Sequence, residues 1–333
     1  MNIGVCGCGG IASWISDILT ELNDDRIVKY GVASAFQQEC KPFAEKWNWK
    51  KVYSSYDELM SDPAIDLVYV AVPNSFHYDV CMKAIAHGKN VLCEKPFAVN
   101  EKQTEAILAA AHEKGVFINE ALWPAFLPSR KIINDEIASG SIGTLTGGEL
   151  VALTNVMFLP RISKLELGGG ALLDMGPYIL GRLAYHFGLD VASVDSKFQF
   201  LDTGVDSRED YTITFRNGCS VICRCQINAD PETEYGILQG TKGRIRINSM
   251  ANPKEILVQD LDGNTQKKLE VPAMTTGKEY PFISGYENEF LACEKALREG
   301  KKECAEAPNE MTRMISKVMT ELRDQAGLVF PFE

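Results

Sequence analysis

The chain has 333 residues, 45 of them acidic and 34 basic, so its formal net charge at pH 7 is −11. With 45% hydrophobic and 24% charged side chains, this composition excludes a disordered chain, a collagen and a coiled coil, and the length suggests two domains of ~150 residues each. The acidic balance speaks against a nucleic-acid partner, because neutralising phosphates needs clustered Lys and Arg.

The first 120 residues alternate short apolar runs with helical patterns, which is typical of βαβ units and a parallel sheet. The pattern predicts strands over residues 2–6, 27–34, 66–72, 90–93 and 116–119, and helices over residues 10–22 and 101–114. We expect a Rossmann domain with a doubly wound parallel sheet of six strands over residues 1–122.

From residue 123 onwards the rhythm changes to alternating strand patterns. The pattern predicts a helix over residues 171–187, then strands over residues 196–201, 211–215, 219–227, 235–240, 243–248 and 256–260. Asn217-Gly218 and Asp262-Gly263 are hairpin signals. Helices over residues 286–299 and 309–325 end the pattern. We expect a second domain over residues 123–333, built on an open, mostly antiparallel sheet, with a cleft between the two domains.

A glycine-rich loop follows the first predicted strand and precedes the first predicted helix. The loop matches the dinucleotide-binding pattern Gly-x-Gly-x-x-Ala, and its expected cofactor-binding residues are Gly7, Cys8, Gly9, Gly10, Ile11 and Ala12. Gly7 permits the tight turn, Gly9 lets a pyrophosphate approach the backbone, and Ala12 lets the helix pack on the strand. The N–H groups at the helix start then attract the anion.

The end of the second predicted strand bears on the choice between NAD and NADP. An acidic residue there holds the ribose 2′-hydroxyl of NAD, whereas an Arg favours the 2′-phosphate of NADP. This chain has Ser34, followed by Ala35 and Phe36, and so has neither residue type. A hydroxyl does not repel phosphate, so we favour NADP, with NAD as the alternative.

Two further loops follow predicted strands at the same edge of the sheet, where ligands of open parallel sheets bind. They contribute the expected cofactor-binding residues Pro73, Asn74, His77, Glu94 and Lys95. Lys95 precedes a proline, which restricts its backbone and fixes its direction. For His77 two interpretations stay open, a packing residue at a helix start and a ligand contact.

The second strong motif is Gly168-Gly169-Gly170, which leads into the predicted helix over residues 171–187. Asp174 and Tyr178 are four residues apart on that helix, so they share a face and can point into one cleft. Arg161, a short distance upstream, is either a substrate contact or a partner in an ion pair.

The sequence gives little support for a metal site, a membrane-spanning segment or disulfide bonds. Cys219, Cys223 and Cys225 share one face of a strand, but the four histidines are far apart and complete no ligand spacing, so we expect no metal. The ten cysteines lie in apolar segments and read as reduced core residues. Without a signal peptide pattern or an apolar run near ~18 residues, we expect a cytoplasmic protein with no membrane partner.

Taken together, these motifs and the segment Glu120-Ala-Leu-Trp123 resemble the glucose–fructose oxidoreductase/inositol dehydrogenase (Gfo/Idh/MocA) family over essentially the whole chain. Within that family they are most similar to the dimeric dihydrodiol dehydrogenase and D-xylose dehydrogenase branch. The resemblance implies a nicotinamide-dependent dehydrogenase acting on a sugar or cyclic diol, and a homodimer or homotetramer formed through the C-terminal sheet.

Oxidising a hydroxyl-bearing carbon requires a base for the hydroxyl proton while nicotinamide takes the hydride. A tyrosine ordinarily has a pKa near ~10, and an ammonium ~4 Å away offsets roughly three units of it. We therefore expect Tyr178 to be the general acid/base, Lys95 to assist it, Asp174 to orient the substrate and Trp123 to form an apolar wall. Two alternatives stay open: a non-catalytic dinucleotide-sensing regulator and an NAD-dependent glycosidase of the same family.

Overall fold

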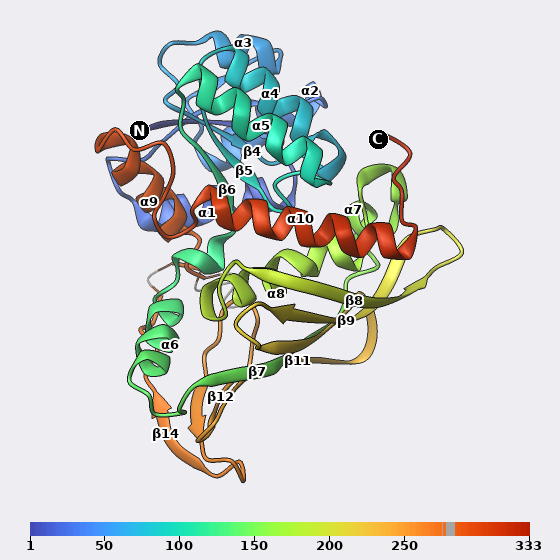
Figure 1. Cartoon of the computed structure of the whole chain (residues 1–333). Helices are drawn as coiled ribbons and strands as arrows, with labels where there is room; N and C mark the ends of the chain where they lie inside the picture. The colour runs from blue at the N-terminus through green and yellow to red at the C-terminus, as the bar shows by residue number, and fades with distance from the viewer. Residues whose placement is uncertain (275, 278–283) are drawn as a thin grey trace. The chain divides into compact units, whose positions relative to one another are not determined.

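The computed structural model describes residues 1–274, 276–277 and 284–333 (Figure 1). The chain divides into two compact units. The first comprises Met1–Ala98, Lys102–Phe126 and Met274–Thr312, and the second comprises Val99–Glu101, Leu127–Ala273 and Arg313–Glu333.

The first unit contains a six-stranded sheet in the order β3-β2-β1-β4-β5-β6, and all its neighbouring strands are parallel. The strands are β1 (Asn2–Cys6), β2 (Val28–Ala33), β3 (Lys51–Val52), β4 (Leu67–Val70), β5 (Asn90–Glu94) and β6 (Ile118–Ala121). The order reverses between β1 and β4, which is the point where open α/β sheets bind ligands beyond the carboxyl ends of their strands. The predicted doubly wound parallel sheet is confirmed.

Helices connect these strands (Figure 1). They are α1 (Gly10–Leu22), α2 (Gln37–Trp47), α3 (Tyr56–Ser61), α4 (His77–Ala86) and α5 (Glu101–Lys114). α1 packs beside α2, and α3 packs beside α4. Every residue of β4 is buried, as expected for a strand covered on both faces.

The expected domain boundary between residues 122 and 123 differs from the compact units, because Met274–Thr312 packs with the first unit. Its helix α9 (Glu287–Arg298) lies against α1 and against the short helix η2 (Trp123–Phe126). Phe290 packs edge-on against Tyr69 of β4, with ring centroids 5.3 Å apart. The sequence around α9 carries no local signal that this helix packs on the first unit, so the sequence did not predict this part of the domain division.

The second unit contains an eight-stranded sheet in the order β14-β13-β12-β11-β7-β10-β9-β8. The strands are β7 (Leu145–Asn155), β8 (Val191–Phe200), β9 (Asp206–Phe215), β10 (Ser220–Gln226), β11 (Asn228–Gly240), β12 (Arg244–Ile247), β13 (Ile256–Gln259) and β14 (Thr265–Leu269). β7 and β10 are parallel, and every other neighbouring pair is antiparallel. This confirms the predicted, mostly antiparallel sheet.

One face of this sheet is covered by helix α8 (Ala171–His186), which packs against β7, β9 and β10. The other helices of this part of the chain are α6 (Pro128–Ala138), α7 (Pro160–Ser163) and α10 (Asn309–Ala326). All ten cysteines carry free thiols, and all except Cys8 are buried, as the sequence predicted. No helix within the described residues is long and apolar enough to cross a membrane.

Candidate functional site

The glycine-rich loop lies between β1 and α1, and its first glycine is required by the backbone. Gly7 has φ +114°, and its N–H donates to the carbonyl oxygen of Ala33 at 2.8 Å. A Cβ at Gly7 would lie 2.3 Å from the carbonyl oxygen of Ala71, much closer than any real contact. Only glycine therefore brings the loop this close to the ends of both neighbouring strands.

The next two glycines leave open space instead. A Cβ at Gly9 or Gly10 would meet no protein atom within 4 Å, and both residues are exposed. α1 begins at Gly10 and receives no side-chain cap from Gly9, while Ala12 is buried against the fold. A helix N-terminus with uncrowded backbone in front of it is where a pyrophosphate binds, so the loop fits a dinucleotide.

Cys8 and Ser34 meet beside this loop. Cys8 Sγ lies 3.9 Å from Sγ of Cys40, and burial raises the pKa of Cys8 to about 12, so its thiol stays neutral. The Ser34 hydroxyl accepts the N–H of Phe36 at 3.1 Å and also contacts the Cys8 thiol. Ser34 thus links the glycine loop to the end of β2, and Glu39, in the first turn of α2, lies close enough to add to the rise in the pKa of Cys8.

His77, at the start of α4, links two loops. Its Nδ1 lies 2.7 Å from the carbonyl oxygen of Pro96, and its Nε2 lies 2.9 Å from that of Val72. The side chain is buried, which lowers the pKa of His77, while the two carbonyl contacts act in the opposite direction. Of the two interpretations left open for His77, this geometry favours the packing residue, because both ring nitrogens are engaged with backbone.

Pro73 and Asn74 lie in the loop after β4, where Pro73 precedes the short helix η1 (Asn74–Phe76) and both residues are half-buried. Lys95 follows β5 directly and is also half-buried. Its N–H donates to Oε2 of Glu94 at 3.2 Å, and the hydroxyl of Tyr69 donates to the other oxygen of Glu94. The predicted cofactor-binding residues of these loops therefore lie at the carboxyl ends of β4 and β5, where ligands of such sheets bind.

Glu120 is a buried glutamate on β6 for which the sequence predicted no role of its own. Its Oε1 accepts the N–H of Phe97 at 3.1 Å, and its Oε2 accepts the hydroxyl of Thr312 at 2.9 Å. Burial, with a smaller contribution from Glu94, raises the pKa of Glu120 to about 7, although the hydrogen bonds from Thr312 and Phe97 and the nearby Lys95 act in the opposite direction. Glu120 thus holds the backbone two residues beyond Lys95. The sequence signal that could have singled out Glu120 is a glutamate inside a strand that is otherwise expected to be buried.

Glu289 is a second buried acid of this unit that sequence reasoning missed. It lies on α9, and neither carboxyl oxygen has a hydrogen-bond partner among the described residues. Burial raises the pKa of Glu289 well above its ordinary value, and the nearby Glu94 adds to this effect. Nothing local in the sequence distinguishes Glu289 from an exposed helix glutamate.

Trp123 was predicted to form an apolar wall. Its ring stacks on that of Tyr286, with centroids 4.4 Å apart and planes 20° apart, and its side chain is buried. The Trp123 Nε1–H has no acceptor within the described part of the chain.

In the second unit, the glycines before α8 are needed for close packing. A Cβ at Gly169 would lie 2.2 Å from the carbonyl oxygen of Ile162. Gly170 has φ +124°, and a Cβ there would lie 1.9 Å from Oδ1 of Asp206. The motif therefore brings the start of α8 against both α7 and β9, instead of leaving backbone open as Gly9 does.

Three predicted substrate-binding residues lie near that helix start. Nη1 of Arg161, on α7, lies 2.8 Å from Oδ1 of Asp174, in the first turn of α8. The side chain of Arg161 is 49% exposed and that of Asp174 only 9%. Tyr178 follows one turn later and is half-buried. The structure thus gives Arg161 the ion-pair role that the sequence left open beside substrate contact.

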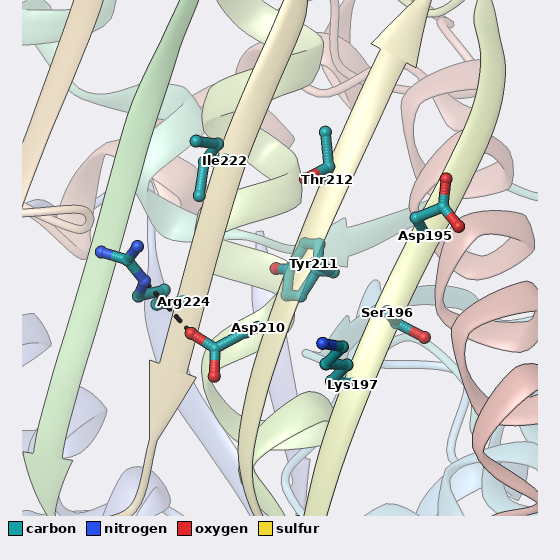
Figure 2. A pocket seen from close by; sticks show the side chains of 8 residues that line it. All are labelled: Asp195, Ser196, Lys197, Asp210, Tyr211, Thr212, Ile222 and Arg224. Atoms are coloured by element: carbon teal, nitrogen blue, oxygen red, sulfur yellow. Dashed lines mark hydrogen bonds and ion pairs between the residues drawn. The ribbon is translucent and has the colours of Figure 1, made fainter.

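The sheet of the second unit carries a pocket. Figure 2 shows it on β8, β9 and β10, lined by Asp195, Ser196, Lys197, Asp210, Tyr211, Thr212, Ile222 and Arg224. Arg224 joins Asp210 at 3.1 Å and Glu149 of β7 at 2.7 Å. None of the predicted site residues lines this pocket. Among the described residues, no group of three or more His, Cys, Asp or Glu is placed to hold a metal ion.

Two family models match the chain. Residues 1–121 match the model described as "Oxidoreductase family, NAD-binding Rossmann fold", and residues 132–246 match the GFO/IDH/MocA C-terminal domain. Among curated proteins, trans-1,2-dihydrobenzene-1,2-diol dehydrogenase of Mus musculus is 30% identical over 335 residues, covering 98% of this chain and 97% of the relative. The Xenopus laevis enzyme of that name is 32% identical and covers 98% of each chain.

Solved structures share the fold. The 3-ketoreductase KijD10 of Actinomadura kijaniata, in complex with NADP and TDP-benzene, superposes with a TM-score of 0.86 at 22% identity, covering 97% of both chains. A levoglucosan dehydrogenase in complex with NADH and levoglucosan gives a TM-score of 0.83 at 20% identity, covering 98% of this chain and 97% of that one.

Proposed function

The chain belongs to the Gfo/Idh/MocA oxidoreductase family and is an NAD(P)-dependent oxidoreductase acting on CH–OH groups, and we propose that its substrate is a sugar or a cyclic diol. The relatives named as dihydrodiol dehydrogenases support the diol, and the structural similarity to a levoglucosan dehydrogenase is compatible with a sugar. Both substrates present neighbouring hydroxyl groups on a ring.

One observation supports this substrate class most directly, namely the Arg161–Asp174 pair with Tyr178 one turn away. A carboxylate accepts hydrogen bonds from hydroxyl groups, and a guanidinium donates to them. Asp174 has its charge held in place by Arg161, so it is ready to orient a ring with several hydroxyls. We propose both residues, together with Trp123 as an apolar wall, as substrate-binding.

In the proposed reaction, Tyr178 is the general acid/base and Lys95 assists it. Oxidation breaks the O–H bond of one hydroxyl group and the C–H bond of the carbon that carries it, and a C=O bond forms. The proton goes to the Tyr178 oxygen and the hydride goes to the cofactor. Nicotinamide supplies the hydride acceptor, or the donor in the reverse direction. The ammonium of Lys95 stabilises the negative charge on the phenolate. This role requires Lys95 to stay protonated.

For the cofactor, we propose that the loop of Gly7, Gly9 and Gly10 holds the pyrophosphate, which the open space at Gly9 and Gly10 supports. Cys8, Ile11, Ala12, Pro73, Asn74 and Glu94 complete the proposed contacts. At the end of β2, Ser34 stands where NAD-specific sites carry an acid, so the residue at that position adds no negative charge against a 2′-phosphate. We propose NADP as the preferred form. Titrating the protein with NADPH and with NADH, followed by nicotinamide fluorescence, tests this choice.

We further propose a homodimer, or a homotetramer, formed through the sheet face that carries Ile222 and Arg224 (Figure 2). Ile222 is a large apolar side chain with 45% exposure, and it lies beside the ion pairs of Arg224 with Asp210 and Glu149. An apolar centre with a fixed charge pattern suits a self-complementary interface. Light scattering after size exclusion of the native protein and of Ile222→Asp tests it: the variant is expected to be monomeric.

The activity itself is tested by mixing the protein with NADP or NAD and a panel of aldoses, inositol and cyclic diols, and following the absorbance of reduced nicotinamide. We expect net reduction of the cofactor with at least one member of the panel. A protein that holds the cofactor tightly but gives no net turnover with any of them would contradict the dehydrogenase.

A further inference from the structure

Helix α8 begins without a cap from its own sequence. Gly170 precedes the helix and carries no side chain, yet the first N–H groups of a helix need acceptors. The N–H of Leu172 donates to Oδ2 of Asp206 at 2.8 Å, and the N–H of Ala171 also donates to Asp206. Asp206, at the start of β9, therefore does what an N-cap side chain ordinarily does, from 34 residues further along the chain.

Asp206 does not stand alone, because Glu209 lies beside it on the same strand and both side chains are fully buried. The two carboxyl groups are hydrogen-bond neighbours. Asp206 Oδ1 and Glu209 Oε1 receive no hydrogen bond from any N–H or O–H of the described residues. Two ionised carboxylates cannot donate to one another, so this arrangement requires one proton between them.

The surroundings decide which group carries that proton. Asp206 accepts from N–H groups at the positive end of a helix, which favours its ionised form. Glu209 shares one of these partners, the N–H of Leu172, and its Oε2 accepts the thiol of Cys225 at 2.6 Å. Burial raises the pKa of Glu209 well above its ordinary value, and Asp206 adds to this. Burial also raises the pKa values of Cys225 and Tyr211, so these neighbours are neutral.

We propose that Asp206, sharing one proton with Glu209, is a positioning residue that fixes the first turn of α8 and thereby the side chains of Asp174 and Tyr178. The connection is short, because the N–H of Asp174 makes its helical bond to the carbonyl of Gly170, at 3.2 Å. A loosened first turn therefore displaces Asp174 directly. The effect on catalysis rests on the proposed function. The capping of α8 by Asp206 does not depend on that function.

The test compares Asp206→Asn with Glu209→Gln in the full-length protein. Glutamine reproduces a protonated glutamate, because its amide N–H donates to Asp206 and its oxygen accepts from Cys225. Asparagine at 206 removes the anion from the helix start and turns its own amide toward Glu209. Asp202→Asn, an exposed carboxylate near the same strand, is the matched control.

For Asp206→Asn we expect the amides of residues 171–174 to exchange roughly tenfold faster with deuterium, because the first turn of α8 loses the negative charge that stabilises a helix N-terminus. We also expect kcat/KM for the alcohol substrate to fall at least ~10-fold while the Kd of the cofactor changes less than ~2-fold. Glu209→Gln and Asp202→Asn are expected to match the native protein in both measurements. If Asp206→Asn does not fold, the comparison is made between Glu209→Leu and Glu209→Gln. Glu209→Leu leaves Asp206 without its proton donor, whereas Glu209→Gln keeps a donor.

Native exchange and turnover in a folded Asp206→Asn would overturn the proposal. A Glu209→Gln variant as impaired as Asp206→Asn would overturn the shared proton. If the native protein turns over no alcohol at all, the proposed function fails, but the exchange rates of residues 171–174 still decide whether Asp206 caps α8.

Discussion

Nη1 of Arg161 lies 2.8 Å from Oδ1 of Asp174, so the charge of a nearly buried aspartate is balanced by an arginine whose own side chain is half-exposed. Such a pair contributes little to folding, because the exposed partner is screened by water. The effect of the pair is instead on the position of the Asp174 carboxylate. The arginine holds one carboxylate oxygen in place next to the helix face that also carries Tyr178.

Replacing Arg161 with Ala is therefore expected to raise the KM of the alcohol substrate about tenfold, a loss that corresponds to about 1.4 kcal/mol, while changing the unfolding free energy by less than about 1 kcal/mol. Arg298→Ala is a matched control, because Arg298 is also exposed and pairs at 3.2 Å with Glu294, whose side chain is as buried as that of Asp174. Steady-state kinetics and urea unfolding measure both effects. An unchanged KM in Arg161→Ala would remove Arg161 from the proposed substrate site.

Two glycines of the loop after β1 are expected to respond differently to the same substitution. Gly7→Ala places a methyl group 2.3 Å from a carbonyl oxygen at a φ of +114°, so it should destabilise the fold by about 2–4 kcal/mol. Gly9→Ala meets no protein atom, so its unfolding free energy should stay within about 0.5 kcal/mol of the native value.

Gly9→Ala should nevertheless weaken cofactor binding at least ~10-fold, because the methyl group occupies the space proposed for the pyrophosphate. Thermal unfolding and fluorescence titration with NADPH separate the two effects. Native affinity in Gly9→Ala would mean that the pyrophosphate binds elsewhere.

The pH dependence of stability contains a contribution from Glu120. Burial raises the pKa of this carboxyl from its ordinary 4.5 to about 7 in the folded protein. As the pH rises, the unfolded state therefore loses this proton at a lower pH than the folded state does. The stabilisation is fully present below about pH 4.5 and is lost as the pH rises to about 7, amounting to about 3 kcal/mol.

Glu120→Gln removes the titration, and its amide has an oxygen to accept the N–H of Phe97 and an NH2 group to donate to the hydroxyl oxygen of Thr312. Relative to this variant, the native protein should lose up to about 3 kcal/mol of unfolding free energy between about pH 4.5 and about pH 7. Urea unfolding of both proteins across this range measures the difference. Identical pH profiles would show that Glu120 does not titrate in that window.

Lys95→Met is expected to fold and to bind cofactor normally but to lose at least ~100-fold in turnover, the scale of general acid/base catalysis. Lys83→Met, which removes an exposed lysine paired with Asp57 in the same unit, is the control and should keep native kinetics. Native turnover in Lys95→Met would contradict the role proposed for Lys95.

Much of the fold could be predicted from the sequence because its signals are local. The glycine loop, the apolar run of β4 and the Asn217-Gly218 turn between β9 and β10 each depend on neighbouring residues only. β7 was missed, because two adjacent glycines and several polar residues interrupt its alternating pattern. Its place in the sheet is set by its partners β10 and β11.

The candidate site divides in the same way. The one-turn spacing of Asp174 and Tyr178 follows from helix geometry, so it could be predicted from their positions alone. Asp206 and Glu209 could not, because nothing in a strand sequence says which buried acid meets the start of a distant helix. The same holds for Glu289, whose burial depends on the packing of α9.

The proposed mechanism depends above all on the hydroxyl of Tyr178, and the most direct measurement is single-turnover hydride transfer in Tyr178→Phe. The account predicts native cofactor affinity, a native unfolding midpoint and a rate at least ~100-fold below that of the native protein. Tyr235→Phe, which removes a hydroxyl bonded to Glu149 in the same unit, should react at the native rate. A Tyr178→Phe protein that transfers hydride as fast as the native one would contradict the account.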